Sequence, residues 1–102
     1  MTFEERVVRV IFRAIDGVNE HLDKRNRLQK SLDTVLSGEK GKLDSLGLVN
    51  FIVGLEQEIE KEFGVSVNLI GETTILQYEN PFRSVRSLAG YVTSLLKGGA
   101  HG

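Results

Sequence analysis

KLDSLGLVNFIVGLEQEIEKEFG, residues 42–64, carries the strongest helical pattern in the chain. Asp44 is a typical N-cap residue, because its carboxylate can accept a hydrogen bond from a backbone amide of the first helical turn. Gly64 is the residue type best suited to the left-handed conformation just past a helix C-terminus. These two signals predict a helix over residues 45–63.

The predicted helix has more apolar residues than one buried face needs. At about 100° per residue, one sector gathers a core face consisting of Leu48, Phe51, Ile52, Leu55, Ile59 and Phe63. A separate apolar strip consists of Leu46, Val49 and Val53, and it is edged by Glu56 and Glu60. Such a strip with a charged rim suits recognition of a partner, but the same residues could also pack under a long loop or against a short helix of the chain itself.

Helices are also predicted on both sides of this segment. Thr2 and Glu5 have the spacing of a capping box, and the apolar residues that follow keep helical spacing as far as Leu22. Near the other end of the chain, Ser84 is a suitable cap for a last helix with a single apolar stripe. Residues 70–80 could hold one short third helix, which would end before Pro81.

The fold class expected from this order is all-α. The elements predict a small antiparallel four-helix bundle with three main helices, one short third helix and a long loop between the first two. Four apolar residues should hold that loop, residues 23–43, against the core: Leu28, Leu32, Val35 and Leu36. Residues 1–97 are expected to form a single domain, and residues 98–102 a flexible tail.

Composition excludes several classes of function. The chain has 102 residues, two histidines, no cysteine and a net charge of −1. Without cysteine there is no disulfide, catalytic thiolate or cysteine zinc site, and two histidines are a poor basis for a metal site or a catalytic triad. We therefore expect no enzymatic activity and no metal. No apolar run approaches the roughly 20 residues of a membrane span, and the start MTFEER is unlike a secretion signal, which favours a cytoplasmic protein.

Two other functions find little support in the residues. The basic run at residues 24–27, with Lys30 nearby, is short and lacks interleaved aromatic residues, so we expect no nucleic-acid binding. A serine hydrolase built on Ser45 and His21 would need a GlyXaaSerXaaGly turn or an oxyanion-hole motif, and neither accompanies this serine.

Ser45 is expected at the first helical position, facing solvent. A phosphodiester on its oxygen would lie beside free backbone amides and the positive end of the helix dipole, which favour an anion. The same Asp–Ser pair also opens many helices that have no special role.

The order of these features resembles the acyl carrier protein family. Asp44, Ser45 and Leu46 are similar to the family's attachment motif, and residues 2–7 to the start of its first helix. Residues 55–64 are similar to the acidic end of its second helix, and residues 84–92 to its last helix. The resemblance covers nearly the whole of an acyl-carrier-like domain at residues 1–97, although each fragment alone is unspecific.

The resemblance implies that Ser45 carries a covalent 4′-phosphopantetheine arm, on whose thiol acyl groups are held as thioesters for fatty-acid, lipid or specialised acyl biosynthesis. It implies as partners a phosphopantetheinyl transferase, an acyl-activating ligase or synthase, and acyltransferases. The docking surface for them would consist of Asp44, Leu46, Val49, Val53, Glu56 and Glu60. We expect a monomer that binds neither nucleic acid nor membrane.

Some residues depart from the family pattern. Gly47 and Asn50 stand where acids are common, so the first turns of the recognition helix are less negative than usual. That helix is also one turn longer than is typical, which favours a specialised carrier. Two alternatives remain open: a peptidyl or aminoacyl carrier with the same serine and arm, and an unmodified helical adaptor that uses the apolar strip alone.

Overall fold

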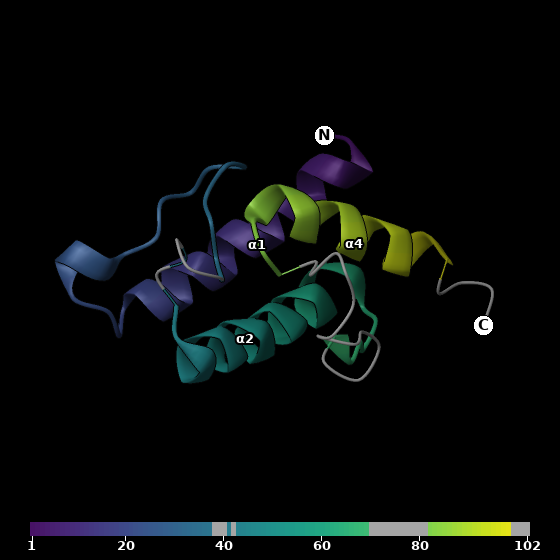
Figure 1. Ribbon diagram of the computed structural model, residues 1–102. Helices are drawn as coiled ribbons and strands as arrows, with labels where there is room; N and C mark the ends of the chain where they lie inside the picture. Colours follow the sequence, from purple (N-terminus) through teal and green to yellow (C-terminus); the bar gives the residue numbers. More distant parts are fainter. Residues whose placement is uncertain (38–40, 42, 70–81, 99–102) are drawn as a thin grey trace.

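The computed structural model describes residues 1–37, 41, 43–69 and 82–98, and within them three α-helices and one 3₁₀ turn (Figure 1). The helices are α1 (Phe3–Asn19), α2 (Ser45–Phe63) and α4 (Val85–Gly98), and the 3₁₀ turn is η1 (Lys24–Asn26). These ranges contain no strand, only an isolated antiparallel bridge between Val35 and Ser84. The predicted all-α class is therefore confirmed, while the short helix expected at residues 70–80 lies outside the described residues.

The helix boundary signals predicted at Thr2, Gly64 and Ser84 are present in the structure. The Thr2 hydroxyl accepts a hydrogen bond from the Glu5 amide at 3.1 Å, and the Glu5 carboxylate accepts one from the Thr2 amide at 2.8 Å, which completes the capping box. At the end of α2, Gly64 adopts the left-handed conformation with φ 71°. Ser84 caps the start of α4, where its hydroxyl oxygen lies 3.2 Å from the Ser87 amide.

The end of α1 differs from the prediction. The helix stops at Asn19, so Leu22 lies beyond it and packs half-buried against the core. The reason lies in the Asn19 side chain, which accepts a hydrogen bond from the Leu28 amide at 2.8 Å and donates one to the Leu28 carbonyl at 2.9 Å. The Asn19 side chain thus binds both backbone groups of Leu28, and this holds the following loop beside the end of α1.

The helix α1 is central, because it packs against both α2 and α4. Its buried face meets residues of both neighbours and of the loops in one core: Val7, Val10, Ile11, Ala14, Ile15 and Val18 of α1; Phe51, Ile52, Leu55 and Ile59 of α2; Val85, Leu88 and Val92 of α4; and Leu28, Leu36, Leu43, Leu69 and Phe82 from the connections. Of the predicted core face of α2, Leu48 and Phe63 are only half-buried and pack at its edges.

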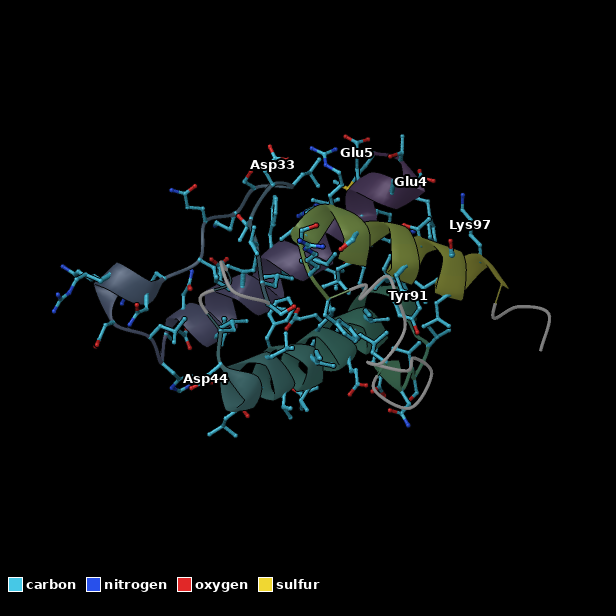
Figure 2. All side chains as sticks on the ribbon, in the orientation of Figure 1. Glu4, Glu5, Asp33, Asp44, Tyr91 and Lys97 are labelled. Carbon is cyan, nitrogen blue, oxygen red and sulfur yellow. The ribbon has the colours of Figure 1, made fainter. Side chains whose placement is uncertain are left out.

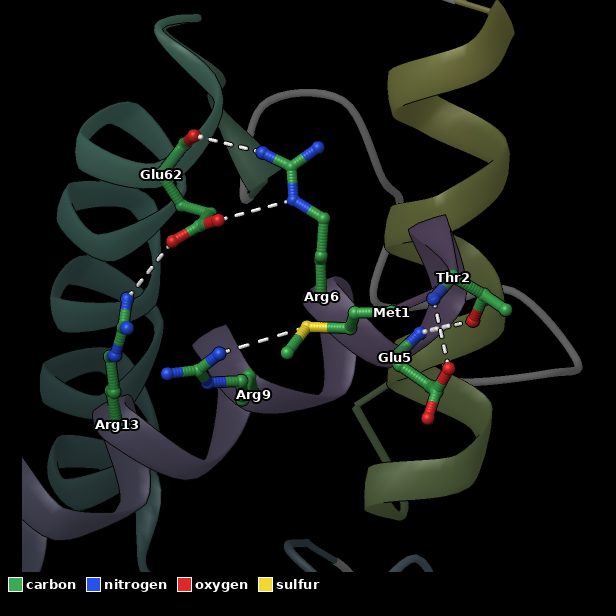
Figure 3. Close-up of polar contacts among 7 residues, drawn as sticks. All are labelled: Met1, Thr2, Glu5, Arg6, Arg9, Arg13 and Glu62. Atoms are coloured by element: carbon green, nitrogen blue, oxygen red, sulfur yellow. Dashed lines mark hydrogen bonds and ion pairs between the residues drawn. The ribbon is translucent and has the colours of Figure 1, made fainter.

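A polar clamp fixes the start of α1 to the end of α2 (Figure 3). The Glu62 carboxylate accepts a hydrogen bond from Arg6 Nε at 3.1 Å and one from Arg13 Nη1 at 3.2 Å. Arg6 also stacks over Phe63, 4.6 Å from the ring centroid, and Phe63 contacts Phe3. These hydrogen bonds, first that from Arg6 and then that from Arg13, lower the pKa of Glu62 below its ordinary value. Because the two helices also pack side by side, this contact between the N-terminal part of α1 and the end of α2 means that they run in opposite directions.

The long loop is attached to the start of α4. The carbonyl oxygens of Thr34 and Leu32 accept hydrogen bonds from the first two amides of α4, those of Val85 at 3.0 Å and Arg86 at 2.9 Å. Arg86 also pairs with Asp33 at 2.9 Å. At the far end of α4, Lys97 pairs with Glu4 at 3.1 Å, and both residues are labelled in Figure 2.

The anchoring of this loop agrees with the sequence prediction. Leu28 and Leu36 are buried, and Leu32 and Val35 are half-buried. The helix α4 extends to Gly98, one residue into the predicted tail, and residues 99–102 lie outside the described residues. No helix in the described ranges is long and apolar enough to cross a bilayer.

Candidate functional site

The candidate site lies at the start of α2, where Asp44 is labelled in Figure 2. Asp44 has an extended backbone, and its Oδ1 accepts a hydrogen bond from the Gly47 amide at 2.7 Å. The Asp44 carbonyl accepts another from the Leu48 amide at 2.8 Å. Asp44 is therefore the N-cap and Ser45 the first residue of α2, as predicted. The orientation expected for the Ser45 side chain lies outside what the structure describes.

Gly47 lies close to the capping residue and to Leu43. A Cβ atom at this position would lie 3.1 Å from Asp44 Oδ1 and 3.4 Å from Leu43 Cδ2. The first distance is shorter than the roughly 3.5–4.0 Å of a favourable carbon contact, so a side chain here would press on the capping carboxylate. A side chain at position 47 would therefore require the capping carboxylate or Leu43 to shift slightly.

The apolar strip of α2 is exposed. Leu46 keeps 70% of its surface accessible, and Val49 and Val53 keep 43% each. The described part of the long loop therefore does not bury the strip, and the short helix expected at residues 70–80, against which the strip could also pack, lies outside the described residues. An exposed row of branched side chains on one helix face is the type of surface that a partner protein can cover.

The acidic rim is only partly available. Glu60 is exposed, as expected for a rim residue. Glu56 is half-buried, and its Oε2 accepts a hydrogen bond from the Leu69 amide at 2.7 Å. This carboxylate fixes the chain that returns after α2, with Leu69 itself buried. The sequence pattern missed this role because the contact joins residues 13 positions apart through the fold.

A groove that the sequence analysis did not foresee runs between α1 and α2. It has a volume of about 700 Å³ and is lined by Ala14, Gly17, Val18, His21, Leu22, Asp44, Leu46, Gly47, Asn50 and Gly54. Two lining residues, Asp44 and Leu46, flank Ser45 in the sequence. The only sequence signal for it is the presence of glycine inside both helices.

Ionisable groups in the lining of the groove are few. His21 and Asp44 line the groove, and His21 is exposed. Across the described ranges, histidine and acidic side chains form no cluster of three or more that could hold a metal ion. The start of α2 therefore combines an exposed apolar surface with a groove whose lining holds one histidine and one carboxylate.

Comparison with known proteins gives no relative. The chain matches no protein-family model, and no curated protein or solved structure is significantly similar to it. A functional proposal therefore rests on the residues and on the geometry at the start of α2.

Proposed function

We propose that the protein is a carrier of acyl groups, held as thioesters on a 4′-phosphopantetheine arm attached to Ser45. The observation that carries the proposal is the exposed strip of Leu46, Val49 and Val53, which begins directly after Ser45 at the tip of α2. A carrier needs its attachment residue beside a surface that successive enzymes can bind, because each enzyme must both dock on the protein and reach the arm.

The elements around the site support the finer parts of the proposal. The order of α1, α2 and α4, with α1 antiparallel to its neighbours, is compatible with an acyl-carrier-like four-helix bundle whose short third helix would fall in residues 70–80. In this proposal the chain catalyses no reaction itself. A transferase, an acyl-activating ligase or synthase, and acyltransferases act on the arm in the cytoplasm.

The attachment step is a phosphoryl transfer with coenzyme A as donor. The Ser45 hydroxyl oxygen attacks the phosphorus next to the pantetheine, a new P–O bond forms, and the pyrophosphate bond of coenzyme A breaks. The leaving group is adenosine 3′,5′-bisphosphate, and the transferase removes the hydroxyl proton. The electrostatic setting favours the product, since the phosphodiester anion would adjoin the amide end of α2.

The test is the intact mass of the purified protein after incubation with a phosphopantetheinyl transferase and coenzyme A. The expected result is a gain of one phosphopantetheine group, which is absent in Ser45→Ala and retained in Ser66→Ala, a matched change at an exposed serine outside α2. No gain, or a gain that persists in Ser45→Ala, would rule out the carrier function.

Docking on the strip has its own matched pair of variants. Val53 and Val65 are almost equally exposed, at 43% and 42%, but only Val53 belongs to the strip. Val53→Ala should slow modification by raising the KM of the transferase for the protein, and Val65→Ala should not. Equal rates for both variants would remove the strip from the docking surface.

A second candidate is an unmodified helical adaptor, which is favoured by the 70% exposure of Leu46, because such a surface can bind a partner without any arm. The mass experiment separates the two functions. An adaptor gains no mass but loses its partner when Leu46 is replaced by serine.

A further inference from the structure

Few free charges lie along the apolar strip of α2. At about 100° per residue, Asn50 and Gln57 border Val53 on one side, and both side chains are exposed and uncharged. On the other side lies Glu56, whose Oε2 accepts the hydrogen bond from the Leu69 amide at 2.7 Å. One border of the strip is therefore neutral, and the carboxylate on the other border is already bonded within the protein.

The first turn of α2 also lacks a strong charge of one sign. Asp44 is the nearest acid to Leu46, and its Oδ1 accepts the hydrogen bond from the Gly47 amide at 2.7 Å. The positive end of the helix dipole lies at the same place and offsets part of the charge of this carboxylate. Residues 20–27, of which His21 lines the groove beside α2, include two acidic and three basic residues. Their charges therefore nearly cancel.

Glu60 is the rim acid that remains for a partner. Its side chain makes no hydrogen bond or ion pair within the described ranges. By contrast, Glu58 pairs with Lys61 at 3.5 Å, and Glu62 belongs to the clamp. Glu60 lies 14 residues after Leu46, which is roughly 21 Å along the helix. The Debye length at physiological salt is about 8 Å, so the charge of Glu60 is largely screened at Leu46.

Apolar contact should therefore dominate binding to the strip. Leu46 exposes 70% of its surface and Val53 exposes 43%, and a partner that covers them removes this apolar area from water. An exposed ion pair contributes much less, because water and salt weaken it and two long side chains lose freedom when they pair. The three exposed side chains of the strip thus outweigh the single free carboxylate.

We propose that the strip binds enzymes whose docking site is an apolar recess with a nearly neutral rim, and that it discriminates against enzymes whose docking site is rich in lysine and arginine. This inference rests on the proposed function and specifies the partners of the same surface. Leu46 enters the recess first, because it is the most exposed side chain of the strip and adjoins Ser45. Asp44 and Glu56, expected from the sequence to face partners, serve the fold instead.

The test compares two phosphopantetheinyl transferases acting on the unmodified protein, one with an apolar docking surface and one with a basic docking surface. Each kcat/KM is divided by the value for that enzyme's own carrier protein, with coenzyme A saturating. The resulting ratio should be at least about tenfold higher for the apolar transferase, and its kcat/KM should fall less than about threefold between about 0.05 and 0.5 M sodium chloride. Equal ratios, or a higher ratio for the basic transferase, would overturn the proposal.

A variant that supplies the missing charge sharpens the comparison. Asn50 is exposed at the border of the strip, so Asn50→Glu adds an acid there without changing the core. With the basic transferase, it should raise kcat/KM at least about threefold at low salt, and with the apolar transferase it should leave kcat/KM unchanged. If Asn50→Glu gives no increase with the basic transferase, charge does not limit docking and the proposal is wrong.

Two further variants compare apolar contact and charge with the apolar transferase alone. Leu46→Ala should raise the KM for the protein about tenfold, whereas Glu60→Gln should change it less than about twofold. Both side chains are exposed, so thermal unfolding of each variant should resemble that of the wild type. An equal or larger effect of Glu60→Gln would contradict the proposal.

The outcomes also separate this inference from the proposed function. If the basic transferase modifies Ser45 efficiently and both salt and Glu60→Gln slow the reaction about tenfold, the partner chemistry is wrong and the carrier function stands. If neither transferase adds a phosphopantetheine group at any salt concentration, the carrier function fails, and this inference fails with it.

Discussion

Replacing Gly54 by alanine should stabilise the unmodified protein, although the residue lies in the middle of a helix that packs on the core. The new methyl group would have no heavy atom within 4 Å, so the substitution causes no overlap. Alanine is about 1 kcal/mol more favourable than glycine in a helix interior, partly because it restricts the unfolded chain. We therefore expect the free energy of unfolding to rise by about 1 kcal/mol.

The same substitution at another glycine should have the opposite sign. Gly64 has φ 71°, a conformation that costs a residue with a side chain roughly 1–2 kcal/mol. Gly64→Ala should therefore destabilise the protein by about 1–2 kcal/mol, although nothing lies within 4 Å of its Cβ position either. Free space is equal at the two sites, and the backbone conformation alone decides the sign.

Thermal unfolding followed by circular dichroism measures both changes. For a domain of this size, 1 kcal/mol shifts the Tm by roughly 4–8 °C, so Gly54→Ala should raise the Tm by several degrees and Gly64→Ala should lower it. Urea titration should give the same order with unchanged m-values. A lower Tm for Gly54→Ala would mean that α1 and α2 approach each other closely at this point, and it would refute the open groove.

Three further predictions concern the core, the loop and the polar clamp. Leu55→Ala removes a fully buried side chain and should lower the free energy of unfolding by about 2–5 kcal/mol in urea titration, whereas a change near zero would contradict its place in the core. Asn19→Ala removes both hydrogen bonds to Leu28 and should lower the free energy of unfolding by about 1–3 kcal/mol. Asn19→Asp should also lower it, because a carboxylate cannot donate a hydrogen bond to the Leu28 carbonyl. An unchanged free energy of unfolding in either variant would show that other contacts hold the loop. Because the pKa of Glu62 is lowered from 4.5 in the folded protein, its ion pairs stabilise the fold above pH 4.5, and this stabilisation is lost as the pH falls through the lowered value. Glu62→Gln should therefore have a lower free energy of unfolding than the wild type at neutral pH, and the difference should shrink in acid. A difference that stays constant with pH would contradict this assignment.

The parts of the fold that are encoded locally could be predicted from the sequence. Asp44 and Gly64 mark the two ends of α2 because a capping carboxylate and a left-handed glycine act within one helical turn. The apolar strip also followed from the helical repeat, whereas its exposure was left open by the sequence and is shown by the structure. The early end of α1 could not be read in this way, since it depends on Asn19 bonding to a residue nine positions away.

The parts that the sequence pattern missed depend on distances between elements. Glu56 looked like a rim residue because the helical angle places it beside the strip, but the returning chain brings the Leu69 amide to its carboxylate. The groove lies between two helices, and no repeat in either helix encodes how they are placed relative to each other. The glycines at 17 and 54 were visible in the sequence, and only the structure shows that they lie along one groove.

The clamp at Glu62 holds the last turn of α2 to α1 (Figure 3), whereas residues of the first half of α2 line the groove. Because Glu62 ties the last turn of α2 to α1, while Leu46 and Val49 in its first turns are exposed, the local stability of α2 should fall from Phe63 toward Ser45. Hydrogen exchange along α2 should accordingly become faster toward its first turns. The proposed attachment residue, Ser45, would then lie on the least stable turn of α2, and a docking enzyme could change the orientation of this turn without disturbing the core.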